Sequence, residues 1–339
     1  MIPDSNSSGK VSLIVASYNH SVFLTRRMDS LLQQTYSDID ILVIDDKSTD
    51  NSVEVLRKYQ SNPKVRLLSR EVNGGWVTVS NQGLALSSGE FVLFANCDDE
   101  CDPLLIESLV SSLSVNPSAG VAFSRSLLVD ENGQEMGDDF LIREVNFRRR
   151  CEKNTLLSGK EMSRYLLHSC VIPNLSAALF RRECLVNIGN FSYEYKVCSD
   201  WDLFFRVAAK YDFAYVSEPL NRFRQHSKTI RSVTKEKIVY EEYFRLLLGE
   251  IARIDLSVLE RSKQRTYVMY LWMVHLFSPS LTGIYNFPYH FKKIFRLDHF
   301  SMIFIFPALL LRFCELSIKS ITKIYNKINK KMAGQINFL

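Results

Sequence analysis

Apolar stretches alternate with amphipathic segments along the N-terminal part of the chain. Four short stretches are dominated by apolar residues and end at polar ones: 11–16, 39–44, 65–68 and 91–95. Such stretches are typical of buried strands. Between the first two, Leu24, Met28 and Leu31 recur at helical spacing and predict a helix over 24–34. Strands that alternate with helices predict an α/β fold, here a doubly wound, mostly parallel sheet with helices on both faces.

Polar clusters follow three of the predicted strands: Ser17-Tyr18-Asn19, Asp45-Asp46 and Asn96–Asp99. The carboxyl ends of parallel strands meet at one edge of a sheet, where open α/β sheets bind their ligands. The carboxylates of Asp98 and Asp99 suit Mg²⁺ or Mn²⁺, metals that usually accompany phosphates. An isolated Asp-Asp pair is more often a solvated loop, but the convergence of three clusters favours a ligand site.

Two further segments carry candidate chemistry. A helix is predicted to begin near Asp200, where Ser199 and Asp202 have the spacing of a capping box. Asp200 is a candidate general base, although the local sequence also fits a structural carboxylate.

The second segment, 221–226, is extended and alternates, so Arg222, Arg224 and His226 share one face. These three side chains are candidates for contact with phosphate or metal. A lone histidine is more often a core or surface residue, and the two neighbouring arginines favour the ligand interpretation.

The C-terminal part differs from the rest. Residues 300–311 are almost entirely apolar and too short for an unaided membrane-spanning helix, which needs about 20 residues. Residues 316–331 combine an apolar stripe with clustered lysines, which is typical of attachment to a membrane surface. The alternatives are that these helices cover the preceding domain or pair two copies of the chain as a homodimer.

Composition narrows the kinds of protein to which the chain can belong. The 339 residues are 46% hydrophobic with a net charge of +5, enough apolar material for a packed core and too little positive charge to indicate nucleic acid. Seven irregularly spaced cysteines predict reduced thiols, and residues 1–10 lack the apolar core of a signal peptide, so a cytoplasmic protein is expected. Neither a Gly-x-Gly-x-x-Gly fingerprint nor a P-loop is present.

Taken in order, the motifs resemble those of family-2 glycosyltransferases, which are inverting enzymes with the GT-A fold that use nucleotide sugars. The motifs that carry the resemblance are 11–19, 43–50, Asn73-Gly74-Gly75, 96–99, 189–191, 199–206 and 222–226. The resemblance covers roughly residues 10 to 230. It implies a polar tail (1–10), a catalytic domain (11–230, with a nucleotide-binding half 11–102 and an acceptor-binding half 103–230) and a helical region (231–339).

The resemblance also implies roles for individual residues. Asp200 corresponds to the catalytic base, and a divalent metal, Mn²⁺ or Mg²⁺, is expected at Asp98, Asp99 and His226. Donor contacts are expected from the nucleotide-binding turns and from the diphosphate-facing side chains: Ala16, Ser17, Tyr18, Asp46, Asn73, Asn81, Asn96, Asp98, Arg222 and Arg224.

Three positions depart from the family pattern. Asn96 replaces the first Asp of the usual Asp-x-Asp motif, Ser80 replaces a common Arg, and Ser199 replaces the Glu before the base. These changes leave open a catalytically inactive sugar-nucleotide-binding or scaffold protein. A nucleotidyltransferase would need a Gly-rich basic loop after the first strand, which 17–20 does not provide.

The implied reaction is metal-dependent inverting transfer of a sugar from a UDP- or dTDP-sugar to a hydroxyl of a glycan or lipid-linked acceptor. Bacterial surface polysaccharide (O-antigen or capsule) biosynthesis is the expected context. The basic, apolar C-terminal part then predicts peripheral contact with the inner face of the cell membrane.

Overall fold

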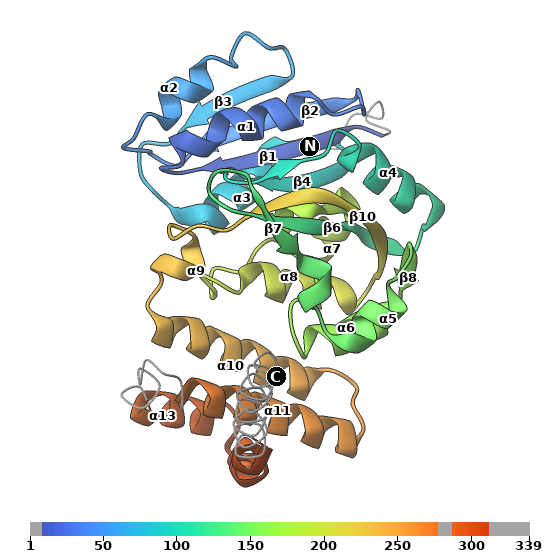
Figure 1. Cartoon of the computed structure of the whole chain (residues 1–339), viewed down its shortest axis with the longest axis vertical. Coiled ribbons are helices and arrows are strands. Elements are labelled where there is room, and N and C mark those ends of the chain that lie inside the picture. The colour runs from blue at the N-terminus through green and yellow to red at the C-terminus, as the bar shows by residue number, and fades with distance from the viewer. Residues whose placement is uncertain (1–8, 277–286, 312–339) are drawn as a thin grey trace, which may run out of the picture. The chain divides into compact units, whose positions relative to one another are not determined.

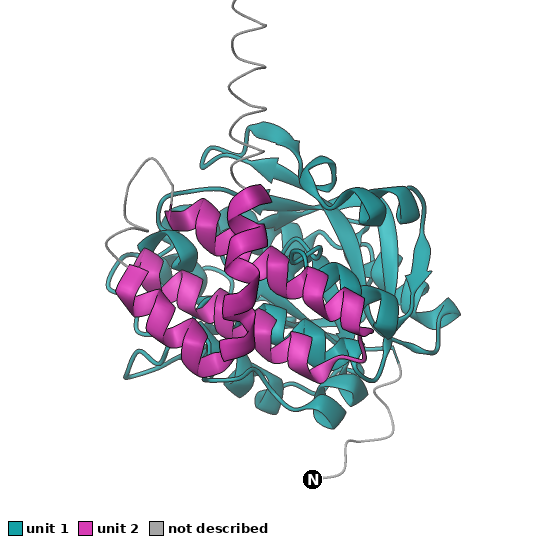
Figure 2. Ribbon diagram, turned by 90° about the horizontal axis from the view of Figure 1, so that it is seen from below, with its two compact units in different colours: residues 1–234 teal, residues 235–339 magenta. Residues whose placement is uncertain are grey.

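Ten strands form one sheet in the computed structural model, which describes residues 9–276 and 287–311 (Figure 1). The chain divides into two compact units, Met1–Thr234 and Lys235–Leu339, coloured in Figure 2. Most of the predicted polar tail and the whole amphipathic segment 316–331 lie outside the described residues.

The first unit contains the sheet, whose main path runs β3-β2-β1-β4-β9-β6-β10-β5. One half is parallel and follows the predicted strands: β1 (Val11–Ser17), β2 (Ile39–Asp45), β3 (Val65–Ser69) and β4 (Phe91–Asn96). In the other half, β6 (Ala119–Val129) and β10 (Asp212–Arg224) are parallel to each other, and β9 (Ala178–Arg181) runs antiparallel between β4 and β6. Three short strands complete the sheet: β5 (Glu100–Cys101), β7 (Glu135–Asp138) and β8 (Thr155–Leu157).

Helices cover both faces of the parallel half because its strands are apolar on both sides. On one face Val43 of β2 packs in a core cluster with Leu24 of α1 (Ser21–Leu32) and Leu109 of α4 (Leu105–Val115). On the other face Leu42 and Ile44 pack with Val79 of α3 (Gly75–Leu86). Each fully buried aliphatic side chain contributes about 1.5–3 kcal/mol to folding. The predicted doubly wound, mostly parallel architecture is confirmed.

The remaining helices of this unit are short. They are α2 (Ser52–Arg57), η1 (Asp139–Ile142), α5 (Val145–Arg150), α6 (Gly159–Leu166), η2 (Leu175–Ala177), α7 (Arg182–Ile188), α8 (Ser199–Ala208) and α9 (Ile230–Val233).

The predicted capping box at the start of α8 is wrong. The N-cap is Cys198, and the Ser199 hydroxyl donates instead to the carbonyl of Ser192 at 2.9 Å. Asp202 forms an ion pair with Arg206, one turn further along the helix. A tertiary contact to a preceding loop therefore replaces the local cap.

The second unit is helical. It contains α10 (Glu236–Arg253), α11 (Val258–Leu276), α13 (Phe287–Leu297) and η3 (His299–Phe304). Among the residues that the structure describes, no helix combines the length and the apolar character needed to cross a bilayer.

Candidate metal and nucleotide site

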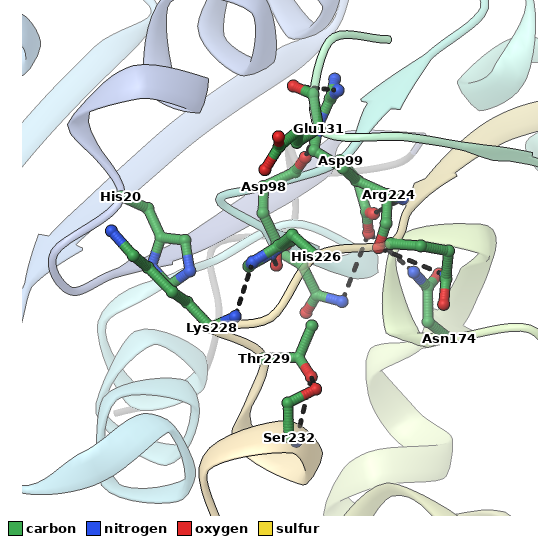
Figure 3. Close-up of polar contacts among 12 residues, drawn as sticks. His20, Asp98, Asp99, Glu131, Asn174, Arg224, His226, Lys228, Thr229 and Ser232 are labelled. Carbon is green, nitrogen blue, oxygen red and sulfur yellow. Dashed lines mark hydrogen bonds and ion pairs between the residues drawn. The ribbon is translucent and has the colours of Figure 1, made fainter. Parts of the chain in front are cut away.

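Three side chains meet at the carboxyl end of β4. The Nε2 atom of His226 lies 2.9 Å from Oδ2 of Asp98, and His20 completes the group (Figure 3). One ligating atom from each of the three residues lies within 4.8 Å of those of the other two. His20 comes from the turn after β1, Asp98 from the end of β4, and His226 from the segment after β10. The fold thus joins residues that are far apart in the sequence, since Asp98 and His226 alone are separated by 128 positions.

The turn after β1 is shaped by Asn19. Its backbone is left-handed, with φ at 54°, a conformation that Asn tolerates better than most residues. Its Oδ1 accepts hydrogen bonds from the amide of Thr49 at 2.7 Å and from the Thr49 hydroxyl at 3.3 Å. The turn after β1 is thereby tied to the turn after β2, and His20 is placed over the end of β4.

The adjacent carboxylates Asp98 and Asp99 have opposite pKa shifts. Burial raises the pKa of Asp98, but the hydrogen bond from His226 and the electrostatic attraction of the nearby imidazole groups of His20 and His226 outweigh it, so the net shift is downward. Burial and the charge of Asp98 raise the pKa of Asp99, against the opposing effect of Arg27. Asp98 is therefore the carboxylate that carries negative charge most readily at this strand end.

Both oxygens of the Asp99 carboxylate accept hydrogen bonds from other residues of the chain. Its Oδ2 accepts hydrogen bonds from the Asn174 amide and the Ser176 hydroxyl, both at 2.7 Å, and its Oδ1 accepts one from the backbone amide of Arg224 at 2.9 Å. The side chain is 1% exposed. Asp99 was predicted as a metal ligand, yet the clustered donor atoms belong to His20, Asp98 and His226, and these contacts make Asp99 a support for the turn.

Arg224 is also engaged by protein groups. Its guanidinium donates to the carbonyls of Asp98 and Asp130, both at 2.7 Å, and pairs with Glu100. The side chain is completely buried. A guanidinium with this many partners ties the end of β4 to the β6–β7 hairpin, and no donor contact is needed to explain it.

A second cluster lies at the end of β2. The Asp46 carboxylate accepts hydrogen bonds from the amides of Gly74, at 2.9 and 3.1 Å, and Gly75, at 2.7 Å, while Asn73 donates to the Asp46 carbonyl. Arg70 lies 3.4 Å away as an ion pair. Asp46 therefore holds the 73–75 loop in place, whatever it also contributes to a nucleotide base.

Other predicted donor contacts are distributed as follows. Ser17 is buried, with its hydroxyl 3.4 Å from Asp45, whereas Tyr18 is 43% exposed at the same strand end, next to Ala16. Asn96 donates to Asp99 at 3.3 Å and so belongs to the β4 cluster.

Asn81 and Arg222 lie elsewhere. Asn81 is buried, and its amide makes paired hydrogen bonds with the backbone of Phe191 at 2.9 and 3.0 Å. Arg222 is an exposed side chain paired with Glu135 at 3.4 Å. In the structure Asn81 clamps a loop and Arg222 supports the β7 edge.

Asp200, the predicted base, lies in the first turn of α8. Its Oδ1 accepts a hydrogen bond from the amide of Trp201 at 2.8 Å, and the Trp201 indole donates to the carbonyl of Leu166. The Asp200 charge helps burial to raise the pKa of Cys170 to about 12. A carboxylate at the start of a helix is stabilised in its charged form by the helix dipole.

A match to a family model decides the classification. Residues 12–189, more than half of the chain, match the model described as glycosyl transferase family 2. The chain belongs to glycosyl transferase family 2. The predicted family is therefore confirmed, and the matched segment contains β1, β4 and Asp98.

Relatives of this family-2 chain are known from bacteria. The uncharacterized glycosyltransferase YibD of Escherichia coli (strain K12) is 39% identical over 107 residues, which are 31% of this chain and 31% of YibD. An uncharacterized glycosyltransferase of Haemophilus influenzae is 25% identical over 228 residues, 66% of this chain and 68% of that protein. The alignment with YibD thus spans about a third of that relative's length.

Among solved structures, S. aureus TarS 1–349 in complex with UDP-GlcNAc is similar to this chain. The TM-score is 0.63 at 20% identity, covering 87% of this chain and 81% of that chain. At that identity the likeness concerns the fold, and it agrees with the predicted GT-A architecture.

Two of the positions where this family-2 chain departs from the pattern are internal. Ser80 is 3% exposed and Ser199 is completely buried. Sequence reasoning identified Asp98 and His226 but missed His20, the third member of the cluster. The available signal was a histidine that directly follows the polar turn after the first strand.

Proposed function

We propose that this chain is a metal-dependent, inverting glycosyltransferase that transfers a sugar from a nucleoside-diphosphate sugar to a hydroxyl group. The observation that carries the proposal is the contact of Asp98 with His226 at the carboxyl end of β4, in a chain of glycosyl transferase family 2. Ligands of open α/β sheets bind at this edge.

Asp98 and His226 fit a divalent cation. A carboxylate oxygen and an imidazole nitrogen are ordinary ligands of divalent metals, and the lowered pKa of Asp98 keeps its carboxylate charged. When bound, such an ion neutralises charge on a diphosphate leaving group. Arg224 and Asp99 hold the Asp98 turn rigid, which preserves the geometry that catalysis requires.

The chemical step is a single displacement. Asp200 accepts the proton of the acceptor hydroxyl as its oxygen forms a bond to the anomeric carbon. The bond from that carbon to the diphosphate oxygen breaks, and the nucleoside diphosphate leaves with the electron pair. One displacement inverts the anomeric configuration.

The donor is proposed to be a UDP- or dTDP-sugar, and the acceptor a glycan or lipid-linked glycan in bacterial surface polysaccharide biosynthesis. The TarS structure in complex with UDP-GlcNAc supports a UDP-sugar, because the two folds are alike. The exposed Tyr18, beside Ser17 at the end of β1, is the side chain most available to a base.

A donor screen tests the proposal. Purified protein is incubated with UDP-, GDP- and dTDP-sugars and with bacterial glycan acceptors, in Mn²⁺, Mg²⁺ or EDTA, while released nucleoside diphosphate is measured. We expect release from one donor that EDTA abolishes. Donor binding without turnover under any condition would support the alternative, an inactive sugar-nucleotide-binding protein.

Asp200→Asn isolates the base. The amide cannot accept the proton, and general base catalysis contributes about 10²–10⁴-fold, so we expect transfer to fall by about that factor while calorimetry shows an unchanged donor affinity. Asp202→Asn, in the same helical turn, is the matched control. Near-normal transfer by Asp200→Asn would show that another group takes the proton.

We also propose that the second unit contacts an anionic membrane surface. On α13, Phe287, Phe291 and Phe295 recur every fourth residue and are 41%, 40% and 54% exposed, while His290 and Ile294 are buried on the other side. Apolar side chains continue after the helix, with Ile303 71% and Phe306 77% exposed.

Charge complementarity argues for lipid as the occupant of this apolar face. Lys292 and Arg296 are exposed and directly follow Phe291 and Phe295 in α13. An amphipathic helix with basic residues beside its apolar stripe is attracted to anionic headgroups while it buries its aromatic rings.

Vesicle co-sedimentation tests this contact. We expect binding to vesicles containing phosphatidylglycerol, weaker binding to phosphatidylcholine alone, and loss of at least half of the bound protein in Phe291→Asp/Phe295→Asp. Val115→Asp, which changes a 74% exposed apolar side chain of the first unit, is the control. If the double variant binds vesicles normally but converts a dimer to a monomer, the face pairs two copies of the chain instead.

A further inference from the structure

We propose that His20 is a third ligand of the metal site, so that the site is a two-histidine, one-carboxylate centre that prefers first-row transition-metal ions to Mg²⁺. The inference rests on the proposed function, in which Asp98 and His226 hold a divalent cation. It adds a residue from the β1–α1 turn and specifies the class of ion.

The orientation of His20 supports this role. Its Nδ1 lies 2.6 Å from the carbonyl oxygen of Tyr18, and a carbonyl only accepts, so Nδ1 carries the ring proton. In the neutral ring Nε2 then has a free lone pair. Metal-bound histidines commonly donate their other ring N–H to a backbone carbonyl in this way, which fixes the tautomer.

The Nε2 atom of His20 has no partner among the described residues although it is buried from solvent. A buried nitrogen that makes no hydrogen bond costs free energy, of the order of 1–3 kcal/mol. The ligating atoms of Asp98 and His226 lie within 4.8 Å. A cation between the three residues would satisfy this lone pair.

The two imidazole rings are held by packing as well. Phe23 lies against both, with ring centroids 6.0 Å from His20 and 5.0 Å from His226, and the two histidine rings meet edge to face at 5.4 Å. The Phe23 side chain is 8% exposed. Rings fixed in this way do not need to be ordered when a ligand binds, which is the advantage of a preorganised site.

His226 must adjust on binding. Its Nδ1 accepts a hydrogen bond from the amide of Lys228 at 3.2 Å, so the proton shared with Asp98 lies on Nε2. Coordination through Nε2 moves that proton to Nδ1 and opens the contact with Lys228. Figure 3 shows His226 and Lys228 in the segment that leads to Thr229 and Ser232.

The donor set determines the preferred ion. Mg²⁺ favours oxygen ligands and retains several waters, whereas imidazole nitrogen favours ions such as Co²⁺, Zn²⁺ and Fe²⁺. Two imidazoles with one carboxylate therefore favour the transition metals. A site made of Asp98 and Asp99 alone would lack this bias.

Calorimetric titrations with Co²⁺ and Mg²⁺ test the inference on the full chain after EDTA treatment, with and without saturating UDP, together with visible absorption of the Co²⁺ complex. For His20→Gln we expect Co²⁺ affinity to fall by at least about 10-fold, the low end of what losing even an outer-shell partner costs. Mg²⁺ affinity should change by less than about threefold, because His20 adds little for an oxygen-seeking ion. His168→Gln, another histidine of the first unit, should match the wild type.

The outcomes separate this inference from the proposed function. Unchanged Co²⁺ binding and absorption in His20→Gln, with loss of binding in Asp98→Asn, would overturn the role of His20 and leave the metal site intact. Weaker UDP binding in EDTA with unchanged Co²⁺ affinity would make His20 a diphosphate contact and also overturn it. Equal losses of Co²⁺ and Mg²⁺ affinity would overturn the selectivity. Metal binding unaffected by Asp98→Asn would instead refute the metal site of the proposed function.

Discussion

Two Asp-Asp pairs end strands on either side of β1, and the structure uses them differently. At the end of β2, Asp45 accepts hydrogen bonds from Ser48, and Asp46 holds the 73–75 loop. At the end of β4, the Asp99 carboxylate likewise accepts hydrogen bonds from protein groups, whereas Asp98 faces two histidines.

The difference shows that a carboxylate after a strand is not in itself a functional signal. Three of the four carboxylates accept hydrogen bonds from backbone amides, which need partners where strands end in turns. Asp98 differs because the groups that face it are the ring nitrogens of two histidines. The functional candidate is therefore the carboxylate whose partners could themselves bind a metal ion.

Among substitutions of these carboxylates, Asp98→Asn should have the largest effect on sugar transfer. The change keeps the size of the side chain but removes its charge, and we expect transfer to fall by about 10³-fold, equivalent to about 4 kcal/mol of transition-state stabilisation. The free energy of unfolding should change by less than about 1 kcal/mol, as for an ordinary partly exposed hydrogen bond. Turnover assays and urea unfolding measure the two quantities, with the exposed Asp38→Asn as control. If transfer by the variant stays within tenfold of the wild type, the role of Asp98 is structural.

Asp99→Ala should have the reverse profile. Asn174, Ser176 and the Arg224 amide would lose a buried acceptor, and each unsatisfied buried group costs about 1–3 kcal/mol. We expect the free energy of unfolding to fall by at least about 3 kcal/mol in urea denaturation. A variant that is as stable as the wild type but loses metal binding would instead make Asp99 a ligand.

Asp46→Ala should have a smaller effect on stability than Asp99→Ala. The amides that donate to Asp46 lie in a partly exposed loop, where water can replace the lost contacts, so we expect a loss of about 1–2 kcal/mol. Donor affinity of the same variant is measured by calorimetry. A loss of affinity larger than the loss of stability would show that Asp46 also contacts the nucleotide base.

Sequence alone predicted the parts that depend on local pattern. The apolar stretches of β1, β2 and β4 and the spacing in α1 predicted the parallel half of the sheet, because strands that are apolar on both faces require helices on both sides. The segment 140–158 has no clear periodicity in the sequence, yet η1, α5 and β8 form in and beside it. Short elements of this kind depend on tertiary contacts more than on their own periodicity.

The candidate site, too, could be predicted from the sequence only in part. Placing Asp98 at the carboxyl edge followed from one strand end, and strand order then brought the ends of β1 and β4 together. Only the tertiary structure decided that Asp99 and Arg224 are hydrogen-bonded to other protein groups and that His20 lies with Asp98 and His226, which is 128 positions after Asp98. Such partners are selected by contacts between distant segments, and a hydrogen bond or a shared ligand site leaves no periodic trace in the sequence.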